Sequence, residues 1–217
     1  MKVLIIAGHG GGDPGAIGNT YKECTLTRHL LECIINRLAY SQYDMDVTKY
    51  DITKNCYEES KKGNVPSYTD YDFVLELHFN AFSDSSARGS EVLYRTDDRV
   101  KVFGEALLTK MGNLGFANRG LKLRSDLLNM NNCRNKGVPY ALFETCFITN
   151  AGDVSRYTAT SNEIADAIID SIAYAFGCDE SDTFYRVQVG AFKNRQNAVN
   201  YCQELKGKGI DCFVVES

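Results

Sequence analysis

Apolar runs that suit buried strands alternate with helical periodicity up to residue 176, and this alternation constrains the fold more than any other feature. The apolar runs predict strands at residues 3–7, 72–79, 89–94 and 138–147. Apolar residues at helical spacing predict helices over residues 21–40, 100–111 and 161–176. We therefore expect an α/β domain with a mixed, largely parallel sheet flanked by helices.

The C-terminal end follows a different pattern. Residues 178–183 are polar and acidic and predict a linker, which divides a main domain at residues 1–177 from a small unit at residues 184–217. Within that unit, residues 185–192 alternate as a strand, an apolar helix face follows, and residues 210–215 suit a second strand. The tail is thus predicted to form one β-α-β unit.

Composition narrows the class of protein. The chain has 217 residues, of which 44% are hydrophobic and 24% charged, so it can bury a sizeable core and is not a disordered chain. A formal net charge of −4 offers no basic excess for nucleic acid, and there is no basic cluster of the kind that membrane surfaces attract. We expect neither nucleic acid nor membrane as a partner.

The N-terminal segment does not have the pattern of a signal peptide. The apolar run at residues 3–7 is shorter than the core of a signal peptide, and the glycine-rich residues after it do not form a cleavage site. No stretch approaches the roughly 20 apolar residues of a membrane span. We expect synthesis in the cytoplasm without a signal peptide. The eight cysteines form no C-x-x-C pair, which favours buried thiols over a zinc ribbon.

Two of the three histidines are candidate functional residues. His9 lies just beyond the carboxyl end of the first predicted strand, where α/β sheets place their sites. His78 lies in a strand whose alternation puts Glu76, His78 and Asn80 on one face. Each histidine taken alone is more often a hydrogen-bonded structural residue than a ligand, whereas the third, His29, is expected to be solvated in mid-helix.

Two glutamates have open interpretations. Glu23 ends a Thr-x-x-Glu pattern that begins at Thr20 and is typical of a helix capping box, but it also lies on the side of the buried helix stripe, where a metal shared with histidines would compensate its charge. Glu144 is the only charge in the strand-like residues 138–148. A structural ion pair and a functional role are both open for it, and the second is favoured.

Five motifs occur in the order found in one enzyme family: HGGGDPGA at residues 9–16, Glu23, HFNA at residues 78–81, NRGLK at residues 118–122 and LFETCFITN at residues 142–150. Through these motifs the chain resembles the zinc-dependent N-acetylmuramoyl-L-alanine amidases over residues 2–176. The resemblance implies that His9, Glu23 and His78 bind zinc and that Glu144 is the catalytic acid/base. Candidate substrate-binding residues are Asn80, Arg119 and, in the tail, Gln188.

The implied function is peptidoglycan hydrolysis, in which zinc-activated water cleaves the amide between N-acetylmuramic acid and L-alanine. The signal-less build resembles phage endolysins and mother-cell lytic amidases, which act on the cell wall after release. The tail resembles half of a SPOR peptidoglycan-binding repeat. Because so small a unit cannot bury its own core, we expect a homodimer through residues 183–217 whose joint sheet binds glycan.

Two other functions remain open at this stage. A cysteine-dependent wall amidase or peptidase would use Cys146 or Cys24 as nucleophile and His78 as base, and Cys146 is expected on the strand face of Glu144. A thiolate needs an electropositive setting, and the sequence indicates none. A non-catalytic wall-binding module is the third alternative.

Overall fold

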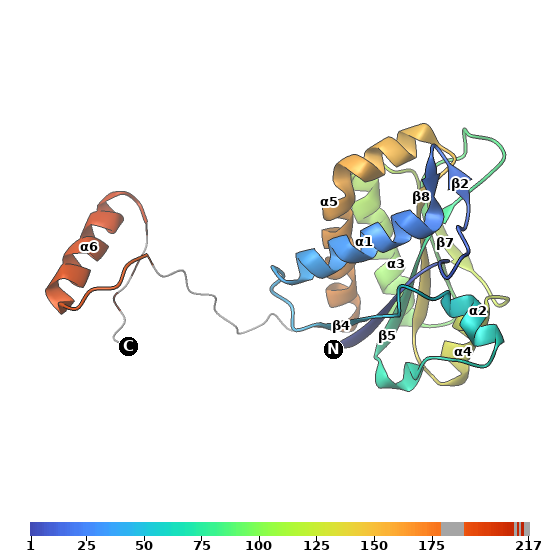
Figure 1. Cartoon of the computed structure of the whole chain (residues 1–217), viewed down its shortest axis with the longest axis horizontal. Helices are drawn as coiled ribbons and strands as arrows, with labels where there is room; N and C mark the ends of the chain where they lie inside the picture. The colour runs from blue at the N-terminus through green and yellow to red at the C-terminus, as the bar shows by residue number, and fades with distance from the viewer. Residues whose placement is uncertain (179–188, 211, 213, 215–217) are drawn as a thin grey trace. The chain divides into compact units, whose positions relative to one another are not determined.

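The computed structural model describes residues 1–178, 189–210, 212 and 214 (Figure 1). The chain divides into two compact units, Met1–Ser181 and Asp182–Ser217, which are described separately below.

A six-stranded sheet with the order β4-β1-β5-β8-β6-β7 forms the centre of the N-terminal unit. Its strands are β1 (Lys2–Ala7), β4 (Asp46–Lys49), β5 (Phe73–Asn80), β6 (Ser90–Tyr94), β7 (Asn118–Leu123) and β8 (Tyr140–Phe147). Strands β4, β1, β5 and β8 are parallel, β6 is antiparallel to β8, and β7 is parallel to β6. The mixed, largely parallel sheet predicted from the sequence is confirmed.

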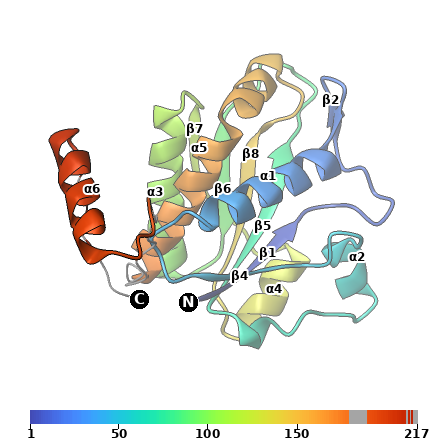
Figure 2. The ribbon, with the colours of Figure 1, turned by 60° about the vertical axis from the view of Figure 1, so that its left-hand side comes forward.

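Helices cover both faces of this sheet (Figures 1 and 2). The larger core lies under three long helices, which are α1 (Glu23–Leu38), α3 (Asp98–Asn113) and α5 (Ala151–Phe176). The smaller core on the other face lies under α2 (Cys56–Lys61), the 3-10 helix η1 (Tyr68–Asp70) and α4 (Leu128–Asn135). Within the described residues, no helix is long and apolar enough to cross a membrane.

Strand β5 shows how the sheet positions functional side chains. Its odd-numbered residues, Phe73 to Phe79, are buried in the larger core under the long helices. The even-numbered Glu76, His78 and Asn80 point to the opposite face, as the period-two alternation predicts. Because β5 lies between β1 and β8, this polar face is central to the sheet rather than at its edge.

The predicted elements are present with shifted ends. Helix α5 begins at Ala151, ten residues before the predicted start, because Asn150 caps it by accepting a hydrogen bond from the backbone N–H of Asp153. The chain departs from helical geometry at Thr160 (φ −129°, ψ 24°), so the predicted helix at 161–176 corresponds to the part after this kink.

The sequence analysis missed several elements, all of them short or polar. Edge strands β4 and β7 are largely exposed and carry no buried alternation, and the two-stranded hairpin of β2 (Ile17–Gly18) and β3 (Tyr21–Lys22) is too short for a period. Helix α2 has six residues and α4 is rich in asparagine. Tertiary packing, rather than local pattern, decides their structure.

The C-terminal unit contains helix α6 (Arg195–Gly207), which confirms the predicted helix. Asn194 caps it by accepting hydrogen bonds from the N–H groups of Gln196 and Asn197. Of the two predicted strands, residues 185–188, 211, 213 and 215 lie outside the described part of the chain. The described positions 189–192, 210, 212 and 214 are not part of a strand.

Candidate active site

His9 is held at the carboxyl end of β1 by a tightly clamped loop. Its backbone is left-handed (φ 62°), a conformation that is uncommon for non-glycine residues and recurs at functional sites. The guanidinium of Arg28 holds this loop by donating hydrogen bonds to the carbonyls of Gly8 (3.0 Å) and His9 (2.9 Å). A side chain at Gly8 would meet the His78 ring at 2.5 Å, so glycine permits the close approach of the two histidines.

Glu23 is the first residue of α1 and is only 4% exposed. The residue in the N-cap position is Lys22 rather than Thr20, and no side chain caps the helix. The carboxylate of Glu23 instead accepts hydrogen bonds from the backbone N–H groups of Ala16 and Phe79, both at 3.0 Å. The capping-box interpretation of Glu23 was therefore wrong, because the helix starts two residues later than that motif requires.

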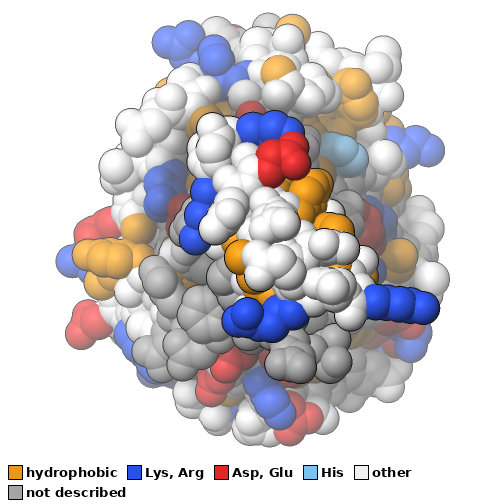
Figure 3. Space-filling model, turned by 90° about the vertical axis from the view of Figure 1, so that its left-hand side faces the viewer, with side chains coloured by type: hydrophobic (Ala, Val, Ile, Leu, Met, Phe, Trp, Pro, Cys, Tyr) orange, Lys and Arg blue, Asp and Glu red, His pale blue; other side chains and the backbone are white. Residues whose placement is uncertain are grey.

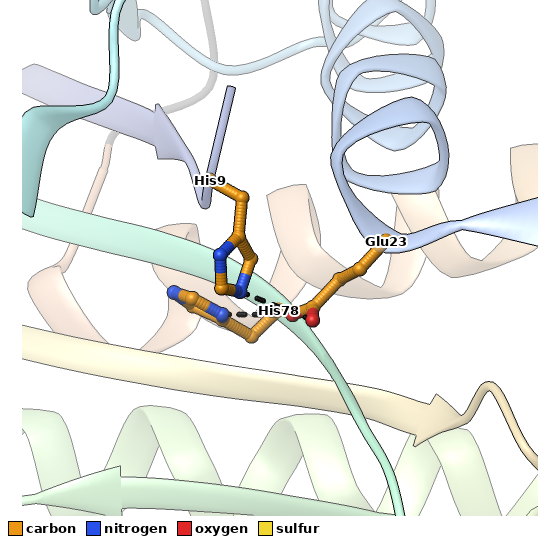
Figure 4. A group of neighbouring side chains, drawn as sticks. All are labelled: His9, Glu23 and His78. Carbon is orange, nitrogen blue, oxygen red and sulfur yellow. Dashed lines mark hydrogen bonds and ion pairs between the residues drawn. The ribbon is translucent and has the colours of Figure 1, made fainter. Parts of the chain in front are cut away.

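The side chains of His9, Glu23 and His78 converge on one point (Figure 4). His9 Nε2 lies 3.0 Å from Glu23 Oε2, and His78 Nδ1 lies 2.9 Å from Glu23 Oε1. Burial opposes ionisation of Glu23, but its hydrogen bonds with the two histidines outweigh this effect and hold its pKa well below the usual range. The cluster is thus a buried anion between two imidazoles.

The chemistry of this donor set fits a divalent metal ion. One ligand atom from each of the three residues lies within 4.8 Å of the others. Two imidazole nitrogens and one carboxylate oxygen are a ligand set that catalytic zinc sites use, with a further position left for water. The outer nitrogen of each histidine contacts a second carboxylate: His9 Nδ1 lies 2.7 Å from Asp13, and His78 Nε2 lies 3.1 Å from Glu76.

Sequence reasoning assigned no role to Asp13 or Glu76. Both had a readable signal, because Glu76 shares the strand face of His78 and Asp13 follows His9 by four residues in the glycine-rich loop. Asp13 is itself fixed by the side-chain amide of Asn55 (3.0 Å) and the N–H of Gly15 (2.9 Å). Carboxylates that receive the outer N–H of a ligating histidine are typical of metal sites.

Glu144 lies next to this cluster, since it pairs in register with His78 across β5 and β8. Its Oε2 atom is buried and has no hydrogen-bond partner among the described residues. Burial, reinforced by the negative charges of Glu23 and Glu91, raises the pKa of Glu144 to about 7 against the opposing charge of His78. In the described part of the chain Glu144 forms no ion pair, so the structural interpretation of this residue has no support.

Asn80 and Arg119 are brought to the same face through Glu91, which the sequence analysis did not single out. Glu91 pairs in register with Glu144. It accepts a hydrogen bond from Asn80 Nδ2 (2.9 Å) and forms an ion pair with Arg119 Nε (2.9 Å). The guanidinium also lies over the ring of Phe147, 4.8 Å from its centroid. The predicted contact Gln188 lies outside the described residues.

Cys146 does not share the strand face of Glu144, which corrects the expectation from simple alternation. The register between β5 and β8 shifts, so that His78 faces Glu144 but Asn80 faces Phe147. This irregularity turns Cys146 into the larger core, where it is fully buried and burial raises the pKa of its thiol well above the ordinary value. A buried thiol of this kind is inert, and the structure gives the cysteine-dependent alternative no support for this residue.

Fold and site together define a class: an α/β domain with a candidate metal-binding cluster beside a partly buried acid, one oxygen of which is buried without a partner. The family of N-acetylmuramoyl-L-alanine amidases (Amidase_3) matches residues 3–174, and the chain belongs to this family. It is a peptidoglycan hydrolase that cleaves the amide bond between N-acetylmuramic acid and L-alanine. The SPOR domain family matches residues 179–216.

Curated relatives include sporulation and phage enzymes. The sporulation-specific N-acetylmuramoyl-L-alanine amidase of Bacillus subtilis is 26% identical over 226 residues, which cover 99% of this chain and 84% of the relative. The endolysin of Bacillus phage SPP1 is 27% identical and covers 79% of this chain and 64% of the relative. The probable autolysin PH of Staphylococcus aureus is 28% identical, but the match spans only 38% of its length.

Solved structures share the fold of the N-terminal unit. The catalytic domain of the CD27L endolysin, which targets Clostridia Difficile, matches with a TM-score of 0.67 and 26% identity over 80% of this chain and 97% of that chain. The catalytic domain of the amidase CwlV from Bacillus (Paenibacillus) polymyxa matches with a TM-score of 0.69 and 21% identity over 82% and 99%.

Proposed function

We propose that the amidase is zinc-dependent, with His9, Glu23 and His78 as the metal ligands and Glu144 as the catalytic acid/base. The observation that supports this most is the convergence of three ligand atoms beside a buried carboxyl oxygen that has no partner. When bound, the zinc ion would supply Lewis-acid activation of water and of the scissile carbonyl.

The residues of the chain would then transfer protons, orient the substrate and shield the metal ligand from solvent. Glu144, with its pKa raised to about 7, is suited both to accept a proton from the attacking water and to return it to the departing amine of L-alanine. The Glu91 carboxylate holds Arg119 and Asn80 on the same sheet face, where their donors would orient the substrate. Burial of Glu23 keeps the ligand carboxylate away from competing solvent.

The C-terminal unit would hold the enzyme on its substrate. As a SPOR domain it indicates peptidoglycan binding, with Gln188 as a predicted glycan contact. Four of its described hydrophobic residues are exposed, namely Val189, Phe192, Ile210 and Val214. On the surface that faces the viewer in Figure 3, hydrophobic side chains lie among basic, acidic and other polar ones. We propose that residues 183–217 pair with a second copy and that this pairing covers the hydrophobic side chains.

Metal analysis of the purified chain with single ligand variants tests the proposal. His9→Ala, His78→Ala and Glu23→Gln should each lower bound zinc and abolish clearing of cell-wall suspensions. Glu144→Gln should keep its zinc and lose about 10²–10⁴-fold in rate. Full lytic activity after exhaustive chelation, or activity abolished only by thiol alkylation, would contradict the proposal and favour a cysteine nucleophile.

A further inference from the structure

Glu76 has a buried carboxylate, and both of its oxygens have hydrogen-bond partners among neighbouring side chains. Its Oε1 lies 3.1 Å from His78 Nε2, on the side of the ring away from Glu23. Its Oε2 accepts hydrogen bonds from the Tyr140 hydroxyl (2.6 Å) and from Asn129 Nδ2 (2.9 Å). The carboxylate is therefore fixed from two sides, and its remaining oxygen is directed at the imidazole.

A second layer of hydrogen bonds holds this arrangement. The Asn129 side chain comes from α4, and its Oδ1 accepts a hydrogen bond from Ser60 Oγ of α2 at 2.9 Å. Because an ionised carboxylate only accepts hydrogen bonds, the amide must turn its NH₂ group to Glu76, and its Oδ1 is then free to accept from Ser60. All three side chains are buried. The two helices that the sequence did not reveal are thus connected to His78 by a continuous buried chain of hydrogen bonds.

This hydrogen-bond network determines which nitrogen of His78 is available to the cluster of His9, Glu23 and His78. An ionised carboxylate only accepts hydrogen bonds, so Nε2 beside Glu76 must keep its proton. Nδ1 faces Glu23, and it is the nitrogen whose proton a metal ion would replace. His9 has the opposite arrangement, because Asp13 contacts its Nδ1 and Nε2 faces Glu23. The two histidines thus present different nitrogens to one point, and each is set by its own carboxylate.

We propose that Glu76 is a positioning residue that presents Nδ1 of His78 to the metal, and that Tyr140, Asn129 and Ser60 hold Glu76 in that role. This inference rests on the proposed function, because it assigns an orienting network to the same metal site. None of the four side chains is proposed to touch the metal or the substrate.

The network predicts graded losses of metal affinity. Glu76→Gln should weaken zinc binding by about 10–100-fold, the range found when the carboxylate partner of a ligating histidine is removed. Tyr140→Phe and Ser60→Ala each delete one supporting hydrogen bond and should weaken it by smaller factors. Ser171→Ala is the matched control, since Ser171 Oγ is also buried and donates only to Ala167 of its own helix.

The experiment measures zinc dissociation constants of the full chain by competition with a chromophoric chelator. Nitrogen-15 NMR of the zinc-loaded chain then identifies the protonated nitrogen of each histidine. We expect a proton on Nε2 of His78 and on Nδ1 of His9, and weaker binding in Glu76→Gln and Ser60→Ala but not in Ser171→Ala. If Glu76→Gln does not fold, Tyr140→Phe and Ser60→Ala decide the question.

Two results would overturn the inference alone: unchanged zinc affinity in all three network variants, or coordination of the metal through Nε2 of His78. A wild-type chain that binds no zinc would refute the proposed function itself, so the two failures are distinguishable.

Discussion

Glu144→Gln should stabilise the metal-free fold although it removes the proposed catalytic group. The structure buries Oε2 of Glu144 without a partner, and its pKa is raised from an ordinary 4.5 to about 7. A carboxyl group with a higher pKa in the folded chain than in the unfolded chain supports folding fully only below about pH 4.5. As the pH rises toward 7, the unfolded chain loses its proton first and the free energy of unfolding falls.

The magnitude follows from that difference in pKa. About 2.5 pH units, at about 1.4 kcal/mol per unit, give a penalty of about 3 kcal/mol once the pH exceeds 7. Glutamine carries no charge and avoids this penalty, but its amide NH₂ group is left buried without an acceptor, which costs about 1–2 kcal/mol. We therefore expect the free energy of unfolding of Glu144→Gln to exceed that of wild type by about 1–2 kcal/mol at pH 8. At pH 4.5 we expect the variant to be no more stable than wild type.

The assay is urea unfolding of the chelator-treated chain at pH 4.5 and pH 8, with the free energy extrapolated to water. Glu163→Gln, a substitution of the same chemistry at an exposed position of α5, is the control and should show no comparable pH-dependent gain. An equal effect of Glu144→Gln at the two pH values, or a loss of stability at pH 8, would refute the conclusion that burial without a partner destabilises the charged carboxylate.

Three further outcomes are expected. Cys146→Ala should retain wall-clearing activity that chelation abolishes and zinc restores; loss of activity with zinc content intact would revive the thiol mechanism. Gly15→Ala should lower the zinc content measured by metal analysis, because the backbone is left-handed (φ +66°) and the added methyl would lie 2.6 Å from His9 and 2.8 Å from Glu23. Light scattering should give the molar mass of a dimer for the full chain and of a monomer for residues 1–177. A monomeric full chain at micromolar concentration would contradict the proposed pairing through residues 183–217.

Local pattern was sufficient for the central strands and long helices. The run at residues 3–7 and the alternation in β5 placed both strands and the polar face of His78, because burial on defined faces leaves a period in the sequence. The edge strands β4 and β7 and the helices α2 and α4 leave no such period. Their conformation depends on neighbours that are distant in the chain.

The sequence by itself determined which residues are candidates for the chemistry: His9 after the first strand, His78 on a polar strand face, and Glu144 as a lone charge in an apolar run. Tertiary structure alone decided how these residues lie relative to one another. It placed Glu23 between two histidines instead of in a capping box, and it turned Cys146 into the core through an irregular register. The physical reason is that periodicity reports the face of a single element, whereas hydrogen-bond partners, register and burial are set only when separate elements pack together.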